Sequence, residues 1–116
     1  MSGEQPTTKE IGDKAESLGV EYLIQNGYSI IEQNFYARKM GEIDIIAQKD
    51  GVIHFIEVKS AKANFDPIYN ITPRKIHKII NSAHYYLKIK NLDSPFCLDA
   101  LIIRGKDIEF IENITL

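Results

Sequence analysis

Two carboxylates and a lysine stand out in the stretch GEIDIIAQKDGVIHFIEVKSA, residues 41–61, where Asp44 and Glu57 interrupt otherwise apolar runs. An ionised carboxylate is costly in a buried strand unless a positive charge accompanies it. Two neighbouring carboxylates can be relieved by protonation of one, by solvation of both, or by a cation between them. A hard divalent ion suits oxygen ligands and also binds phosphates. Lys59, on the same strand face as Glu57, is placed to hold or help deprotonate a water there.

The turn between the two strands decides whether the carboxylates meet. Asp50-Gly51 is a strong two-residue hairpin signal, and this loop places Asp44 directly opposite Glu57. Directly opposed like charges repel by roughly 3 kcal/mol at about 5 Å and an effective dielectric near 20. A slip of one residue in the register would move one carboxylate to the other face of the sheet.

Some of these residues also have an ordinary structural interpretation. Lys59 can form an ion pair with Glu42, which the same register places opposite it. Glu16 lies beside the apolar stripe of an expected first helix, on the side of Gly19, a small residue that would let the helix approach the sheet. In that position Glu16 points either toward the end of the sheet or into solvent.

The order of elements predicts an α/β fold in one domain, residues 1–116, with residues 1–6 flexible. The order is helix, three strands, helix and two strands, at 7–26, 28–36, 42–49, 52–59, 73–90, 96–103 and 107–112. The hairpin is antiparallel, and a strand–helix–strand crossover suits parallel neighbours, so the sheet is expected to be mixed. The second and third strands are apolar on both parities, which predicts cover on both faces.

The charge distribution is uneven, although the net charge is −2. Residues 59–90 hold seven Lys or Arg and one acid, whereas the remainder holds seven basic and fifteen acidic residues. A basic segment in an acidic chain can present a positive surface to phosphates, or it can be a solvated helix face and loop. The candidate phosphate contacts outside the 60–71 loop are Arg38, Lys39, Arg74, Lys75 and Lys78.

The remaining polar residues favour structural roles. Cys97 is the single cysteine, which excludes an intramolecular disulfide and predicts a buried, inert thiol. His54 lies on the opposite strand face from Glu57. Asp99 interrupts the apolar run FCLDALII, where a buried Asp with a hydrogen-bonding partner is favoured over a site residue. No signal peptide or membrane-spanning run is present, so a cytoplasmic protein without membrane contact is expected.

Asp44 with Glu57-Val58-Lys59 resembles the motif of the PD-(D/E)xK nuclease superfamily, with Ile43 in place of the motif's proline. More closely, the chain resembles the YraN-like family of small bacterial proteins, which is similar to archaeal Holliday-junction resolvases. The stretches that carry the resemblance are GDKAESLGVEYL (12–23), NFY (34–36), GEIDIIA (41–47), FIEVK (55–59), TPRK (72–75) and Asp99. Lys62 stands where the family usually has Arg, so the phosphate contact of that position would have to come from Lys62.

The resemblance implies a restriction-endonuclease-like fold, a mixed sheet of about five strands flanked by helices. It implies Asp44, Glu57 and the backbone carbonyl of Val58 as ligands of Mg²⁺, with Mn²⁺ as a substitute. Lys59 would be the catalytic lysine, and Glu16 would complete the acidic cluster. The basic residues would contact nucleic acid, most simply the DNA phosphate backbone.

Three functions are compatible with these features. The leading hypothesis is a Mg²⁺-dependent endonuclease acting on DNA phosphodiesters in processing or repair, selective for junctions or flaps. Junction resolution would require a homodimer with paired sites. The second is a catalytically idle module that binds nucleic acid or a partner protein on the same fold, since some superfamily members only bind. The third, a small-molecule phosphohydrolase, is less favoured because the site lies at a sheet edge beside a basic helix.

Overall fold

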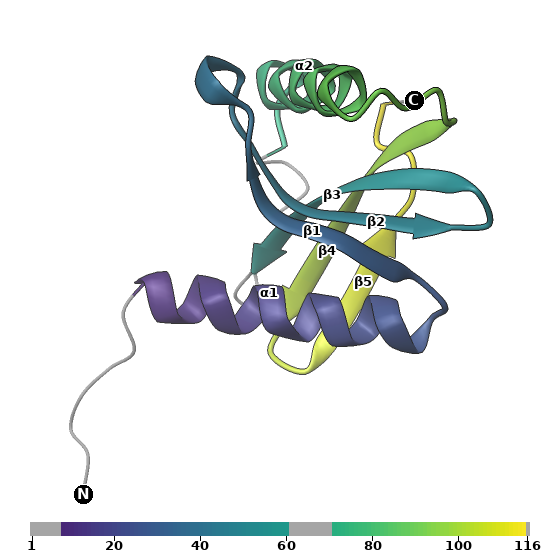
Figure 1. Cartoon of the computed structure of the whole chain (residues 1–116). Coiled ribbons are helices and arrows are strands. Elements are labelled where there is room, and N and C mark those ends of the chain that lie inside the picture. The colour runs from purple at the N-terminus through teal and green to yellow at the C-terminus, as the bar shows by residue number, and fades with distance from the viewer. Residues whose placement is uncertain (1–7, 61–70, 116) are drawn as a thin grey trace, which may run out of the picture.

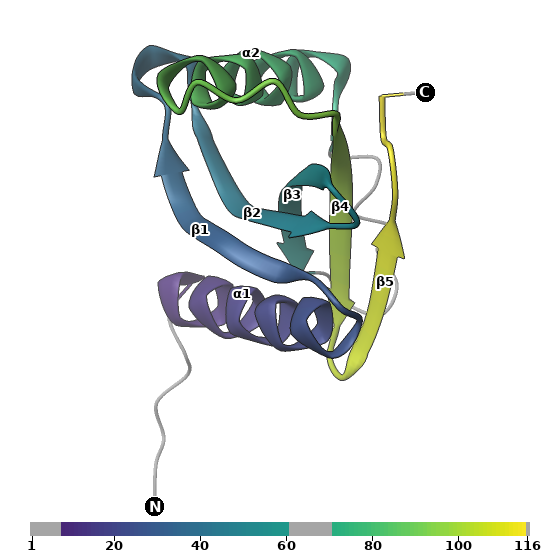
Figure 2. The same ribbon diagram turned by 45° about the vertical axis from the view of Figure 1, so that its right-hand side comes forward.

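The computed structural model describes residues 8–60 and 71–115, and it has a five-stranded sheet with α-helices on opposite sides (Figures 1 and 2). The elements are α1 (Thr8–Gln25), β1 (Ser29–Tyr36), a 3₁₀ turn η1 (Arg38–Met40), β2 (Glu42–Lys49), β3 (Val52–Ser60), α2 (Pro73–Ile89), β4 (Phe96–Arg104) and β5 (Asp107–Ile111). These bounds confirm the expected α/β fold, although η1 was not predicted. Lys62 and the segment 1–6 lie outside the described residues.

The sheet is mixed, as predicted. Its strand order is the chain order, with β3 and β4 parallel across the α2 crossover and the other neighbours antiparallel. The turn at 50–51 has φ values of 51° and 81°, which suit a tight two-residue hairpin. The β2–β3 pairs run from Lys49–Val52 to Ile45–Ile56, so the predicted register is confirmed over this length.

Apolar side chains cover both faces of the central strands. The cluster beneath α2 includes Ile46, Phe55, Ile79 and Tyr86, whereas the cluster beneath α1 includes Leu23, Ile45, Ile56 and Leu101. The two helices in Figure 2 lie on either side of the curved sheet and therefore seal these two clusters from water.

Helix α1 lies close to the sheet at Gly19. A Cβ atom at this position would be 3.2 Å from Cδ1 of Leu101, which is tighter than an ordinary van der Waals contact. The small residue therefore permits the close approach that the sequence predicted. One turn earlier on the helix, the side chain of Glu16 accepts a hydrogen bond from Asn34 of β1.

Candidate metal and phosphate site

Asp44 lies where β2 separates from β3. The ladder ends at the Ile45–Ile56 pair, and the next N–H group of β3 that faces β2, that of Val58, donates to Oδ2 of Asp44 at 2.8 Å. A carboxylate therefore takes the place of a backbone acceptor at the end of the ladder. The predicted direct opposition of Asp44 and Glu57 needs correction, because the paired register stops one step before them.

The two carboxylates nevertheless interact. Burial, first, and the charge of Glu57, second, raise the pKa of Asp44 to about 7. The Val58 N–H and the ammonium of Lys75 act in the opposite direction, and the charge of Glu16 adds to the rise. Asp44 therefore takes up and releases a proton near neutral pH, which is a common property of carboxylates in functional sites.

Glu57 is buried, with 5% of its surface exposed, and two lysines approach one of its oxygens. The Nζ atoms of Lys59 and Lys75 lie 3.6 Å and 3.4 Å from Oε1 of Glu57. The alternative pairing of Lys59 with Glu42 is therefore not observed; Lys59 pairs with the glutamate two residues before it. Lys75, predicted from the sequence as a nucleic-acid contact, reaches the carboxylate site from the first turn of α2.

Glu16 is held near Asp44 by a residue that the sequence did not single out. The Nδ2 group of Asn34 donates to Oε1 of Glu16 at 2.8 Å. Asn34 falls between the Gln33–Ile45 and Phe35–Ile43 pairs of the β1–β2 ladder, a position level with Asp44. Its φ of 53° is unusual within a strand. In the sequence, Asn34 belongs to the NFY stretch that carries the family resemblance, but no chemical role was predicted for it.

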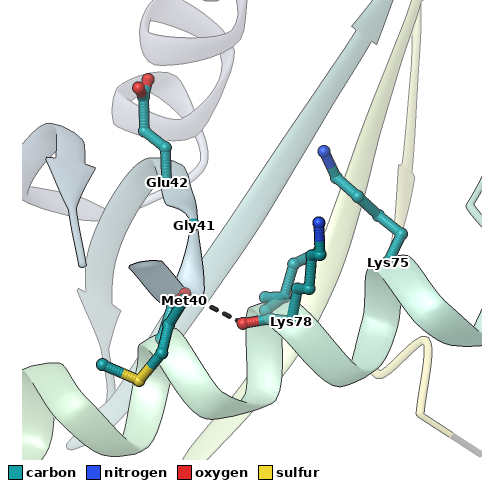
Figure 3. A pocket seen from close by; sticks show the side chains of 7 residues that line it. Met40, Gly41, Glu42, Lys75 and Lys78 are labelled. Atoms are coloured by element: carbon teal, nitrogen blue, oxygen red, sulfur yellow. Dashed lines mark hydrogen bonds between the residues drawn. The ribbon is translucent and has the colours of Figure 1, made fainter. Parts of the chain in front are cut away.

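The other basic candidates of the described chain lie on the two elements next to this site, η1 and α2. Arg38 and Lys39 are exposed on η1, and Arg74 and Lys78 are exposed on α2. A shallow pocket lies between η1 and α2. The side chains of Lys75 and Lys78, which line it, extend from the same helix (Figure 3). The pocket is lined by Met40, Gly41, Glu42, Lys75, Lys78, Ile79 and Ser82.

The donor set of this site suits a hard divalent cation, because Asp44, Glu57 and Glu16 offer carboxylate oxygens. The mutual repulsion that raises the pKa of Asp44 is the kind that such a cation relieves. Among the residues described, however, the three carboxylates do not gather with all ligand atoms within 4.8 Å of one another. Coordination by all three therefore requires a side-chain rearrangement. The role expected for the Val58 carbonyl stays a prediction.

Asp99 belongs to a separate buried network. It is fully buried; its Oδ2 lies 2.5 Å from Nδ1 of His54, and its Oδ1 accepts the Asn113 N–H at 2.9 Å. The favoured interpretation, a buried Asp with hydrogen-bonding partners, is confirmed, as is the structural role of His54. Cys97 is only partly buried, but it donates to Asp99 at 3.3 Å. Burial and the Asp99 charge raise the pKa of Cys97 to about 12, which keeps the thiol protonated.

His54, Cys97 and Asp99 place one potential metal-ligating atom each within 4.8 Å of the others. Hydrogen bonds explain why these atoms lie close together: the Cys97 thiol donates to Asp99, and Nδ1 of His54 is hydrogen-bonded to the same carboxylate. Every buried side-chain nitrogen or oxygen among the described residues has a hydrogen-bond partner, so this network needs no additional ligand.

Curated proteins similar to this chain match it over nearly their full length. A UPF0102 protein of Sulfurovum sp. (strain NBC37-1) is 64% identical over 108 residues, 93% of this chain and 96% of the relative. A UPF0102 protein of Wolinella succinogenes is 65% identical over 105 residues, 90% and 95% of the two chains. One from Helicobacter hepaticus is 52% identical over 105 residues, 90% and 94%.

Neither helix in the described part of the chain is long and apolar enough to cross a membrane.

The profile of the uncharacterised protein family UPF0102 matches residues 15–103, a span that runs from α1 into β4 and includes all of the carboxylates and lysines of the site. With this match and relatives at 52–65% identity, the chain belongs to the UPF0102 (YraN-like) family.

Proposed function

We propose that this protein is a cytoplasmic, metal-dependent endonuclease that hydrolyses DNA phosphodiesters. The observation that carries the proposal is the buried Glu57 beside Asp44, with the ammonium group of Lys59 3.6 Å from the same carboxylate. Two carboxylates and a lysine where the inner strands β2 and β3 separate match the needs of phosphodiester hydrolysis, which requires a cation, an activated water and a positive charge near the developing oxyanion.

Each residue of the site would have a separate role in this hydrolysis. Asp44 and Glu57 would bind Mg²⁺ or Mn²⁺, and Glu16 would supply a further oxygen ligand, either directly or through water. The ion, when bound, supplies Lewis acidity and lowers the pKa of a water. Lys59, fixed at the end of β3, would orient the attacking water and offset negative charge on the phosphate as the bond breaks.

The basic side chains around the site support a nucleic-acid substrate. Arg74 and Lys78 are exposed on α2, and Arg38 and Lys39 are exposed on the neighbouring turn η1. Such residues contact phosphates without reading base sequence, so selectivity would come from DNA shape. The preference for branched DNA, such as a four-way junction or a flap, rests on the resemblance to the Holliday-junction resolvases. Cutting both strands of a junction would further require a dimer with paired sites.

A specific observation supports a second candidate, a DNA- or partner-binding module without catalysis. Glu57 is already neutralised by Lys59 and Lys75, so the carboxylate site has counter-charges from the protein itself. In this case the acidic residues would serve as a structural ion network, and DNA binding would not depend on a divalent cation.

One experiment separates the two candidates. Labelled four-way junction, flap, single-stranded and duplex DNA would be incubated with wild type, Asp44→Asn and Lys59→Met, each with Mg²⁺, Mn²⁺ or EDTA. The nuclease predicts metal-dependent cutting by wild type, loss of cutting in both variants, and retained DNA binding in gel-shift assays. Binding by all three proteins with no cutting under any metal would establish the binding module instead.

A further inference from the structure

Lys75 is the residue whose observed position differs most from its expected role. The sequence placed it on the polar face of a helix, as a contact to the phosphate backbone. Instead its Nζ lies 3.4 Å from Oε1 of Glu57, closer than the 3.6 Å of Lys59. Its charge also lowers the pKa of Asp44, against the effect of Glu57. A cation from α2 therefore acts on both carboxylates that would bind a metal ion.

The position of Lys75 is fixed at its backbone and free at its tip. The Thr72 hydroxyl accepts the Lys75 N–H at 3.1 Å, and Pro73 begins the helix, so the first turn of α2 is well anchored. The Lys75 side chain is 41% exposed, compared with 29% for Lys59. Its ammonium can therefore leave Glu57 by side-chain rotation alone, with no movement of the helix.

The shallow pocket between η1 and α2 offers a second position for the Lys75 ammonium once it leaves Glu57. Lys75 and Lys78 both line this pocket, and both side chains extend from the same side of α2 (Figure 3). Glu42 lines the same pocket, but the two ammonium groups outnumber its one carboxylate, so together they suit a phosphate group that either lysine alone would bind more weakly.

We infer that Lys75 is an exchangeable counter-ion of the carboxylate site. It neutralises Glu57 before a divalent cation arrives, competes with that cation, and on its arrival moves to a DNA phosphate beside Lys78. This inference rests on the proposed function, since it assumes that Asp44 and Glu57 bind a metal. In this inference Lys75 controls how tightly the carboxylate site binds a metal ion. Lys59 has a different role and stays beside Glu57 on β3.

The test measures Mn²⁺ binding without DNA, from the free-ion signal in electron paramagnetic resonance. Lys75→Met and Lys75→Gln remove the competing charge, so their dissociation constants should fall about fivefold below that of wild type, the scale of a partly exposed ion pair. Lys75→Arg keeps the charge and should stay within about twofold of wild type. Lys78→Met, an equal loss of charge one helical turn away, should also stay within about twofold. Melting curves would verify that each variant is folded.

Two outcomes would overturn the inference, and they differ in what they say of the proposed function. If Lys75→Met and Lys75→Gln bind Mn²⁺ no more tightly than wild type, while Asp44→Asn abolishes binding, the metal site stands and the counter-ion role is wrong. If wild type binds no Mn²⁺ that Asp44→Asn removes, the metal site fails as well. In cleavage assays the inference also predicts that Lys75→Met needs less Mg²⁺ for half-maximal rate, at a lower maximal rate.

Discussion

Replacement of Asp44 by Asn should stabilise the folded protein, and the gain should grow with pH. The pKa of Asp44 rises from its ordinary 3.8 to about 7 on folding, mainly because of burial and the nearby Glu57. A carboxyl whose folded pKa is raised contributes stability below its unfolded pKa and loses that contribution as pH rises through the folded pKa. About three pKa units at about 1.4 kcal/mol each give an upper limit of about 4 kcal/mol above pH 7.

Asn is the suitable replacement because its amide oxygen can still accept the Val58 N–H, whereas it carries no charge toward Glu57. The assay is urea denaturation of wild type and Asp44→Asn in EDTA at pH 4.5 and pH 8.5. The stability advantage of the variant should increase by about 3 kcal/mol between the two conditions. Glu42→Gln is the matched control, since it removes an equal charge from an exposed position on the same strand.

A difference between wild type and Asp44→Asn that is the same at both pH values would refute the reasoning, as would a variant less stable than wild type at pH 8.5. Either result would mean that the site tolerates the Asp44 charge without cost. Addition of Mg²⁺ supplies an internal comparison. Because a ligand that binds only the folded state stabilises it, Mg²⁺ should raise the free energy of unfolding of wild type at pH 8.5. The free energy of unfolding of Asp44→Asn should not change.

Three further predictions concern the structure around the site. Asp99→Ala should lower the free energy of unfolding by about 3 kcal/mol, because it leaves His54 and a backbone N–H without a buried acceptor; a loss below about 1 kcal/mol in urea titrations would contradict this. Gly19→Leu should destabilise by about 2 kcal/mol or more through overpacking against Leu101, and an unchanged melting temperature would show that α1 can move away. Native Cys97 should react with a thiol reagent at pH 7.5 far more slowly than in urea, because its pKa is raised to about 12, and equal rates would exclude a protected thiol.

The fold was predictable because its signals are local. Short apolar runs bounded by turn residues marked the strands, and the 50–51 turn fixed the β2–β3 register from Lys49–Val52 to Ile45–Ile56. The order of elements then favoured a parallel β3–β4 pair, which the structure confirms. None of these inferences needed information about residues distant in the sequence.

The ion pairs of the site could not be predicted in the same way. Register arithmetic placed Lys59 opposite Glu42, but it assumed that backbone pairing continues to the ends of both strands. The Asp44 carboxylate ends that pairing early by accepting the Val58 N–H. Lys59 then lies closest to Glu57 of its own strand. A side chain that competes with backbone acceptors leaves no trace in apolar periodicity.

The contact of Lys75 with Glu57 could not be predicted for a different reason, because it depends on how far α2 lies above the sheet. Helical periodicity correctly gives Lys75 a polar face, but it cannot distinguish a face toward solvent from one toward a buried carboxylate. The packing of Ile79 and Tyr86 on the sheet sets the height of α2, and the Thr72 cap sets where its first turn begins. Substitutions that lift α2 should therefore weaken the Lys75–Glu57 pair without touching either residue, so the metal affinity of the site becomes sensitive to core packing beneath this helix.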